Sequence, residues 1–118
     1  MNQIGIIYER PWGTYRTIEQ KNNYQIKHII VFPHKRLSLQ YHYHRDEHWT
    51  VISGYGVASV DGKDFPLEIN DNVFIKKEKP HRMTNPTDTP MEFIEIQIGD
   101  YLGEDDIVRF EDQYGRSE

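Results

Sequence analysis

The sequence has 118 residues, which suits one domain with a modest core and is too short for two full domains. It contains no cysteine, which excludes disulfides, a catalytic thiol and a thiolate metal site, and its net charge of −5 argues against general nucleic-acid binding. No apolar run approaches the roughly 20 residues of a membrane span and the start does not resemble a signal peptide, so we expect a cytoplasmic protein with neither nucleic-acid nor membrane partners.

Short candidate strands separated by turn residues run along most of the chain, a pattern typical of a β-sandwich or β-barrel. No segment keeps a helical period over three turns, although the acidic residues Glu104–Asp106 could open a short helix in an otherwise irregular tail. The sequence therefore predicts an all-β jelly-roll β-barrel in a single domain of residues 1–118, with the barrel at about residues 24–98. The candidate strands, in chain order, are Tyr24–Phe32, Arg36–His44, His48–Ser53, Gly56–Val60, Asp64–Ile69, Asn72–Ile75, His81–Asn85 and Met91–Ile98.

One predicted strand places three polar side chains, Gln40, His42 and His44, on the same face, because side chains alternate along a strand. The carboxylate of Glu47 follows after a short turn, and His81 opens a later strand. Amide oxygen, imidazole and carboxylate groups together form a mixed nitrogen and oxygen site of the kind that suits zinc, iron, manganese, nickel or cobalt. The alternative is an exposed polar strand whose histidines lie in solvent, but the combination of these groups favours the metal site.

The opposite face of that strand is apolar, with Leu37, Leu39, Tyr41 and Tyr43 in a row. If the polar face enters the barrel, this row faces outward and forms an apolar patch that needs a cover. Either a second copy of the chain or the segment Ile4–Tyr8 could supply that cover. We therefore predict a homodimer that forms through this face.

The last predicted strand also has two distinct faces, one with Phe93, Glu95 and Gln97 and the other with Ile94, Ile96 and Ile98. If the isoleucine face fills the core, Glu95 is an exposed acid. If that face is covered from outside, Glu95 and Gln97 point into the barrel. The pattern alone leaves both arrangements open.

Several blocks of sequence resemble a known family. Gln40-x-His42-x4-Glu47-x6-Gly54 resembles the first cupin motif with glutamine in place of the usual first histidine, and His81-x3-Asn85 resembles the end of the second motif. Across about residues 9 to 116, the chain resembles the type II phosphomannose isomerase domain, which usually forms the C-terminal part of bifunctional enzymes with a mannose-1-phosphate guanylyltransferase. The blocks that carry this resemblance are Arg10–Gly13, Leu37–Trp49, His81–Pro86, Ile94–Gln97, Tyr101–Arg109 and Asp112–Arg116.

The resemblance implies a cupin-type jelly-roll β-barrel that binds a divalent metal ion, with zinc as the first choice and cobalt, nickel, manganese or iron as alternatives. It also implies interconversion of the phosphorylated sugars mannose 6-phosphate and fructose 6-phosphate, an isomerisation that needs a base of tuned pKa and no organic cofactor. Nothing in the sequence corresponds to the guanylyltransferase part, so we do not expect synthesis of a sugar nucleotide. The implied metal ligands are Gln40, His42, Glu47 and His81.

The resemblance also suggests residues for the chemistry. Arg109 is the candidate for contacting the substrate phosphate or an enediolate, with a surface ion pair as the alternative. His44 could be a ligand, an acid–base group or a support for a ligand, and His44 and Glu95 are the candidates for the proton-transfer base. Arg45 and Arg82 adjoin predicted ligands but fall on the opposite strand face, where they could bind phosphate or form outer ion pairs.

Two other classes of function remain open from the sequence: a non-catalytic sugar-binding or regulatory cupin, and another cupin enzyme such as an epimerase or dioxygenase. The block Glu104–Arg109 favours the isomerase, because a binding module has no evident need of it. The segment Ile75–Pro80 weakens that interpretation, because it is basic where the family tends to have proline and glycine.

Overall fold

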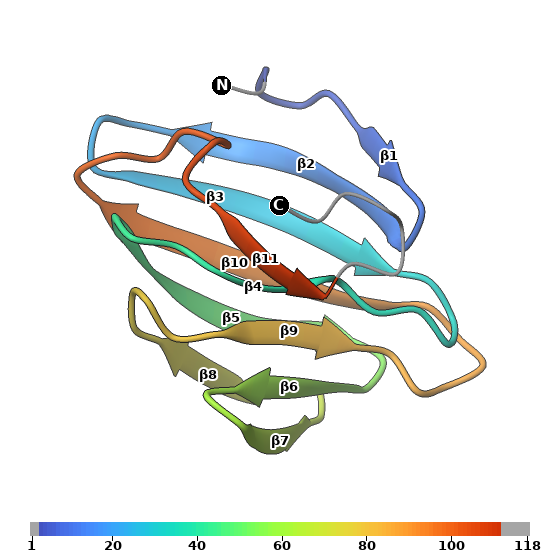
Figure 1. The fold of residues 1–118 in the computed structure, drawn as a ribbon. Coiled ribbons are helices and arrows are strands. Elements are labelled where there is room, and N and C mark those ends of the chain that lie inside the picture. The colour runs from blue at the N-terminus through green and yellow to red at the C-terminus, as the bar shows by residue number, and fades with distance from the viewer. Residues whose placement is uncertain (1–2, 112–118) are drawn as a thin grey trace.

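The computed structural model describes residues 3–111, in which eleven strands form two antiparallel sheets that face each other (Figure 1). None of these residues is helical, so this part of the chain offers no helix that could cross a membrane. The predicted all-β architecture is confirmed. The strands are β1 Tyr8–Arg10, β2 Gly13–Gln20, β3 Tyr24–Val31, β4 Leu39–Tyr41, β5 Arg45–Ser53, β6 Gly56–Val60, β7 Lys63–Leu67, β8 Asn72–Ile75, β9 His81–Thr84, β10 Met91–Gly99 and β11 Val108–Glu111.

The strands are interleaved between the two sheets rather than added in chain order. The first sheet has six strands in the order β1-β2-β3-β10-β5-β8, and the second has five in the order β11-β4-β9-β6-β7. As Figure 1 shows, β10 from late in the chain lies between β3 and β5, and β11 lies beside β4. This interleaving is the arrangement of a jelly roll.

Three long neighbouring strands, β3, β10 and β5, point alternate side chains into the space between the sheets. At one end of these strands the inward side chains are apolar and belong to the core: Ile29, Val31, Trp49, Val51, Met91 and Phe93. At the other end they are polar and also buried: Gln25, Lys27, Arg45, Glu47, Glu95 and Gln97. Because Gln97 pairs with both Gln25 and Glu47, the polar ends of the three strands coincide, and the interior has an apolar half and a polar half.

The inward position of Glu95 resolves the alternative that the sequence left open for β10. Phe93, Glu95 and Gln97 are buried between the sheets, whereas Ile98 is 44% exposed on the outer face of the first sheet. Glu95 is therefore available to the interior polar half.

The predicted strand Arg36–His44 is wrong over most of its length. Only Leu39–Tyr41 pairs as a strand, and Arg36 forms an isolated bridge with Thr84. The chain leaves the second sheet at His42 and enters the first sheet at the start of β5. The simple alternation of faces on which the prediction rested therefore fails on both sides of β4.

Strands β1, β2 and β11 were not predicted. The inward positions of β2 include Gly13 and Thr17, and its register shifts between Thr17 and Glu19, so β2 lacks a clean apolar alternation. Strand β11 is short and follows an irregular segment with a turn at Glu104–Asp105. The tail was expected to be helical or irregular. Its described part is irregular and then forms strand β11.

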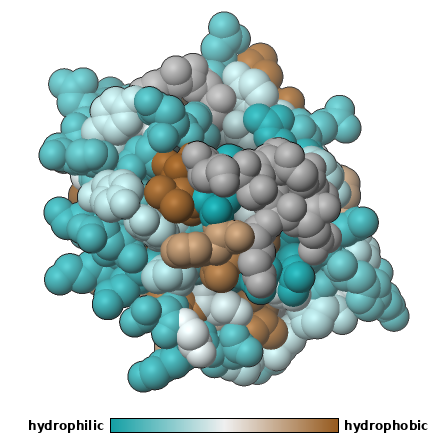
Figure 2. Space-filling model, in the orientation of Figure 1, coloured by the Kyte–Doolittle hydropathy of each residue, from teal (hydrophilic) through white to brown (hydrophobic). Residues whose placement is uncertain are grey.

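The outer face of the second sheet carries an aromatic cluster that we define as Tyr41, Tyr43 and Phe110. Leu37, which the sequence placed in the same outward row, packs against the core instead. The segment around Ile4 does not cover this cluster, because it pairs with β2 at the edge of the other sheet. Figure 2 views the molecule over β4 and β11, where the surface is mostly hydrophilic with a small apolar area near its centre.

Candidate metal centre

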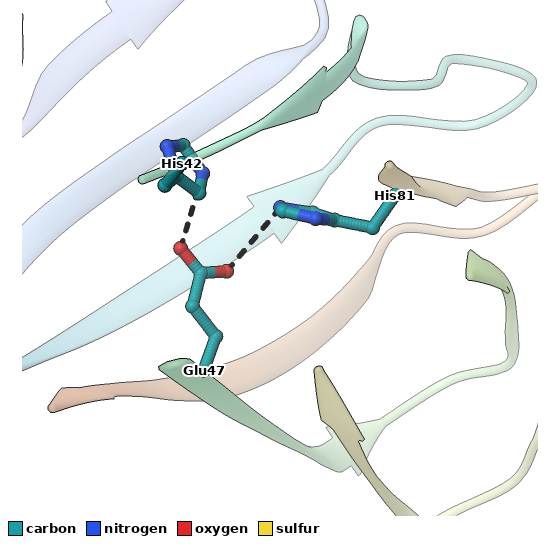
Figure 3. A group of neighbouring side chains, drawn as sticks. All are labelled: His42, Glu47 and His81. Atoms are coloured by element: carbon teal, nitrogen blue, oxygen red, sulfur yellow. Dashed lines mark ion pairs between the residues drawn. The ribbon is translucent and has the colours of Figure 1, made fainter. Parts of the chain in front are cut away.

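Two histidines and a glutamate from three separate elements meet in the polar half of the interior. His42 follows β4, Glu47 belongs to β5 and His81 opens β9, and all three are buried. Their ligand atoms lie within 4.8 Å of one another. Figure 3 shows the Glu47 carboxylate between the two rings, with Oε2 3.3 Å from His42 Nε2 and Oε1 3.6 Å from His81 Nε2.

Backbone carbonyls fix the protonation of both rings. His42 donates its Nδ1–H to the carbonyl oxygen of Asp106 at 2.7 Å, and His81 donates its Nδ1–H to that of Lys79 at 2.8 Å. Because a carbonyl oxygen can only accept, each ring in its neutral form has its lone pair on Nε2, facing Glu47. Two imidazole nitrogens and a carboxylate with oriented rings fit a divalent metal ion such as zinc.

Gln40 borders the same cavity and pairs directly with His81 across β4 and β9. Its amide nitrogen lies 3.3 Å from the carbonyl oxygen of Ser38. With the NH₂ group turned to Ser38, the amide oxygen is the atom that Gln40 offers as a further ligand.

Arg45 lies inside the cavity, and its expected position on the outer face is wrong. Its Nε donates to Glu47 Oε2 at 2.9 Å, and its Nη2 donates to His42 Nε2 at 3.2 Å. The parity changes because the chain turns after β4, so Arg45 shares the inward face of β5 with Glu47. Gly99 permits this close start of β5, since a Cβ there would lie 2.0 Å from the carbonyl oxygen of His44.

A second carboxylate, Glu95, is linked to Glu47 through Trp49. The indole N–H of Trp49 lies 3.1 Å from Glu47 Oε1 and 2.9 Å from Glu95 Oε1. Gln97 donates to the other oxygen of Glu95 at 2.6 Å, and Gln25 donates to Gln97. The polar half is therefore a connected hydrogen-bond network around the two acids.

Burial and nearby charges shift the pKa values of these groups in different directions. Burial and the Glu47 carboxylate raise the pKa of Glu95 above its ordinary value. Burial alone would also raise the pKa of Glu47, but Arg45 and His81 lower it below its ordinary value. Burial, together with the charges of Arg45 and His81, lowers the pKa of His42 to about 3. Glu47 is thus ionised and His42 neutral, as metal ligands must be.

His44 lies outside the cavity, which corrects the expectation that it shares the face of His42. The turn after β4 exposes His44, with its ring 3.5 Å from Asp100 and edge-on to Tyr101. Asp106 holds this turn, because its carboxylate accepts the backbone N–H of Tyr43 at 2.9 Å and that of His44 at 3.0 Å. This role of Asp106 was not predicted, because the sequence indicated only a helix start or a surface ion pair for it.

The cavity has a volume of about 270 Å³ and is bordered by several cations besides the acids. Arg109 of β11 lines it beside Gln40, its partner on β4. Arg82, which the sequence placed on the strand face opposite the ligands, also lines the cavity, as do Arg10 and Lys27. These cations make the cavity suitable for a small polar ligand that carries a negative charge.

Known proteins similar to this chain point to one family. The family described as mannose-6-phosphate isomerase C-terminal matches residues 3–112. The chain is 50% identical over 108 residues to alginate biosynthesis protein AlgA of Pseudomonas aeruginosa, a match that covers 92% of this chain and 22% of that protein. It is 44% identical over 107 residues to mannose-1-phosphate guanylyltransferase ManC of Salmonella typhimurium, covering 91% of this chain and 22% of that protein. The chain thus spans about a fifth of the length of the curated relatives it matches.

Solved structures agree on the fold. The cupin domain of Cnp3 from Schizosaccharomyces pombe superposes with a TM-score of 0.75 at 6% identity, over 80% of this chain and 69% of that chain. At this identity the likeness shows the fold alone, which is that of a cupin.

Proposed function

The chain belongs to the mannose-6-phosphate isomerase C-terminal family, and on that premise we propose that it is a metal-dependent sugar-phosphate isomerase. Its reaction is the interconversion of mannose 6-phosphate and fructose 6-phosphate. The observation that carries the proposal is the convergence of His42, Glu47 and His81 in a cavity that also contains Glu95 and Arg109. A sugar phosphate needs groups that bind hydroxyls, a proton carrier and a cation for the phosphate, and this cavity offers all of them.

We assign the metal to Gln40, His42, Glu47 and His81, with zinc as the first choice. Imidazole, carboxylate and amide donors suit zinc and also accept manganese, iron, cobalt or nickel. When bound, the divalent ion polarises the sugar carbonyl oxygen. The carbonyl contacts at Nδ1 of both histidines support this assignment, because they hold the rings ready to bind through Nε2.

Glu95 is the group that we assign to proton transfer. The base removes the proton from C2 of the aldose and returns it to C1, while the hydroxyl proton of O2 moves to O1, so that no atom is gained or lost. Trp49 and Gln97 orient the Glu95 carboxylate, and its raised pKa suits a group that must both accept and donate a proton.

Arg109 is the group that we assign to the substrate phosphate. A guanidinium can hold a phosphate through two parallel hydrogen bonds. The position of Arg109 on the wall of the cavity, beside Gln40, supports this assignment.

A coupled assay on the full chain tests the proposal: mannose 6-phosphate is added to protein loaded with zinc, cobalt, nickel, manganese or iron, and fructose 6-phosphate is measured. We expect turnover with at least one metal and none after chelation. Glu95→Gln should lose roughly 100-fold or more in kcat. Glu92→Gln, on the outer face of the same strand, is the matched control and should keep full activity. Metal binding without turnover would instead favour a non-catalytic sugar-binding cupin.

We also propose that two copies of the chain associate through the aromatic cluster of Tyr41, Tyr43 and Phe110. Tyr43 is 48% exposed and Phe110 is 52% exposed, and both rings pack on Tyr41, so the three form one continuous exposed aromatic patch. Light scattering at micromolar concentration should give the mass of a dimer, and Tyr43→Lys should shift it towards the monomer. A monomeric mass for the unchanged protein would contradict this prediction.

A further inference from the structure

The Nε2 atom of His42 has a single lone pair, and the structure assigns that lone pair to Arg45. The Nδ1–H of His42 is used by the carbonyl oxygen of Asp106, so Nε2 is the remaining acceptor on the ring. Arg45 Nη2 donates to it at 3.2 Å. A metal ion that binds His42 must use the same lone pair, so the hydrogen bond and the metal bond exclude each other.

Glu47 is affected differently. Arg45 Nε donates to Glu47 Oε2 at 2.9 Å, but a carboxylate oxygen has two lone pairs and the group has a second oxygen, Oε1. Arg45 can therefore keep its bond to Glu47 while the carboxylate binds a metal. Only the contact between Arg45 and His42 has to break.

We therefore propose that Arg45 occupies the metal site in the metal-free protein, where its guanidinium binds both His42 and Glu47. A metal ion then displaces Arg45 Nη2 from His42. The inference rests on the metal site of the proposed function and concerns a residue outside the ligand set. In this role Arg45 is a positioning residue that competes with the metal.

Burial explains why such a cation is needed. Glu47 is 1% exposed and Arg45 is 7% exposed. A buried carboxylate without a partner strongly destabilises a fold, so Glu47 needs a positive charge nearby whenever no metal is bound. Burial opposes the charge on Arg45, but Glu47 and Glu95 raise the pKa of Arg45, so the guanidinium stays charged. Loss of Arg45 therefore destabilises the metal-free protein and also removes the competitor of the metal.

The experiment measures the zinc affinity of the full chain by competition with a chromogenic chelator, in the unchanged protein and in Arg45→Met. If Arg45 competes, Arg45→Met binds zinc roughly tenfold tighter or more, and its thermal stability without metal falls. If Arg45 merely orients Glu47, the variant binds zinc more weakly, and equal or weaker binding overturns the inference. Lys27→Met removes another buried cation of the cavity that contacts Glu104 rather than a ligand. It should change the affinity less.

A measurement on the unchanged protein covers the case in which Arg45→Met does not fold. Zinc should shift the guanidinium NMR signals of Arg45, because its partner at Nη2 is lost, and should leave those of Arg16 on the outside of β2 unchanged. Unshifted Arg45 signals on saturation with zinc would overturn the inference. If the unchanged protein binds no metal at all, the proposed function fails together with it, whereas zinc binding without tighter binding by Arg45→Met refutes only the role of Arg45.

Discussion

The two histidines proposed as ligands are held in fixed orientations. Each ring is buried and each Nδ1–H is bound to a carbonyl oxygen, so each Nε2 has a defined position that an alanine at the same site cannot supply. We predict that His81→Ala and Gln40→Ala lose bound zinc, as measured by metal analysis after gel filtration. His28→Ala is the control, because this histidine faces outward and pairs with Glu92. Unchanged zinc content in either ligand variant would contradict the ligand set.

The neutral state of His42 predicts a pH dependence of stability. Its pKa is about 3 in the folded protein against 6.5 in the unfolded chain. Because the folded pKa is lowered, the contribution of His42 is complete above pH 6.5 and is lost as the pH falls towards 3. In that window the free energy of unfolding of the chelator-treated protein should lose ~1.4 kcal/mol per pH unit through this residue.

NMR of the His42 ring tests this prediction directly. The ring should stay neutral, with its proton on Nδ1, down to about pH 4 in the chelator-treated protein. The difference in unfolding free energy between the unchanged protein and His42→Asn should shrink as the pH falls through the window. Protonation of the folded His42 ring near its ordinary pKa would refute the argument.

The sequence could predict those site residues that a motif identifies, because a motif does not require the strand faces to be known. Residue type and motif spacing identified four such residues, and neither depends on exact strand boundaries. The structure brings all four to one cavity: Gln40, His42, Glu47 and His81. The predicted faces of His44 and Arg45 were both wrong for one reason. The turn after β4 changes which residues point inward, and a pattern of alternating side chains cannot reveal such a turn.

At the scale of elements, the segment between β10 and β11 positions the turn that carries His42. Asp106 supplies a carbonyl to the His42 ring and a carboxylate to the N–H groups of Tyr43 and His44. Asp106→Asn replaces one accepting oxygen with a donor that opposes an N–H group. We predict that this variant binds zinc about 10- to 100-fold more weakly, as measured by chelator competition.

The neighbouring acid provides the control for Asp106. Asp105 is exposed and accepts from the Tyr101 hydroxyl, so Asp105→Asn should bind zinc as the unchanged protein does. Equal affinities for Asp106→Asn and Asp105→Asn would show that the turn does not depend on the Asp106 carboxylate.

Strand prediction succeeded where the strand is bounded by turns marked by glycine, asparagine, aspartate or proline. The bounds of β6 and β8 were predicted residue for residue, and β3 and β10 were each one residue off at one end. Strand β2 was not predicted because its inward positions include a glycine and a threonine. Strand β11 was not predicted because it depends on pairing with a distant segment, β4. Such pairing is a property of the assembled fold and leaves little local pattern.

At the scale of the whole molecule, the proposed metal connects the two sheets. Glu47 lies on β5 of the first sheet, whereas His81 belongs to β9 of the second and His42 follows β4 of the same sheet. Zinc at about 100 times its Kd should add about 2.7 kcal/mol to the free energy of unfolding. We therefore predict a rise in Tm of roughly 10 °C in thermal unfolding, reversed by chelation.

The matched control for this effect is His81→Ala, which keeps the sheets but lacks a ligand from the second one. Its Tm should not respond to zinc. A rise equal to that of the unchanged protein would mean that zinc stabilises the fold from another site.

The division of the interior into an apolar and a polar half implies a trade-off between stability and activity. Folding draws its driving force from the apolar half, around residues such as Trp49 and Phe93, while the polar half buries charges at a cost. Selection can therefore alter the chemistry of the polar half while the apolar half preserves the fold. Conversely, apolar substitutions of well-matched shape in the polar half would yield a more stable barrel without the proposed proton-transfer group, so under the proposed function Glu95 and Gln97 lower stability in exchange for chemistry.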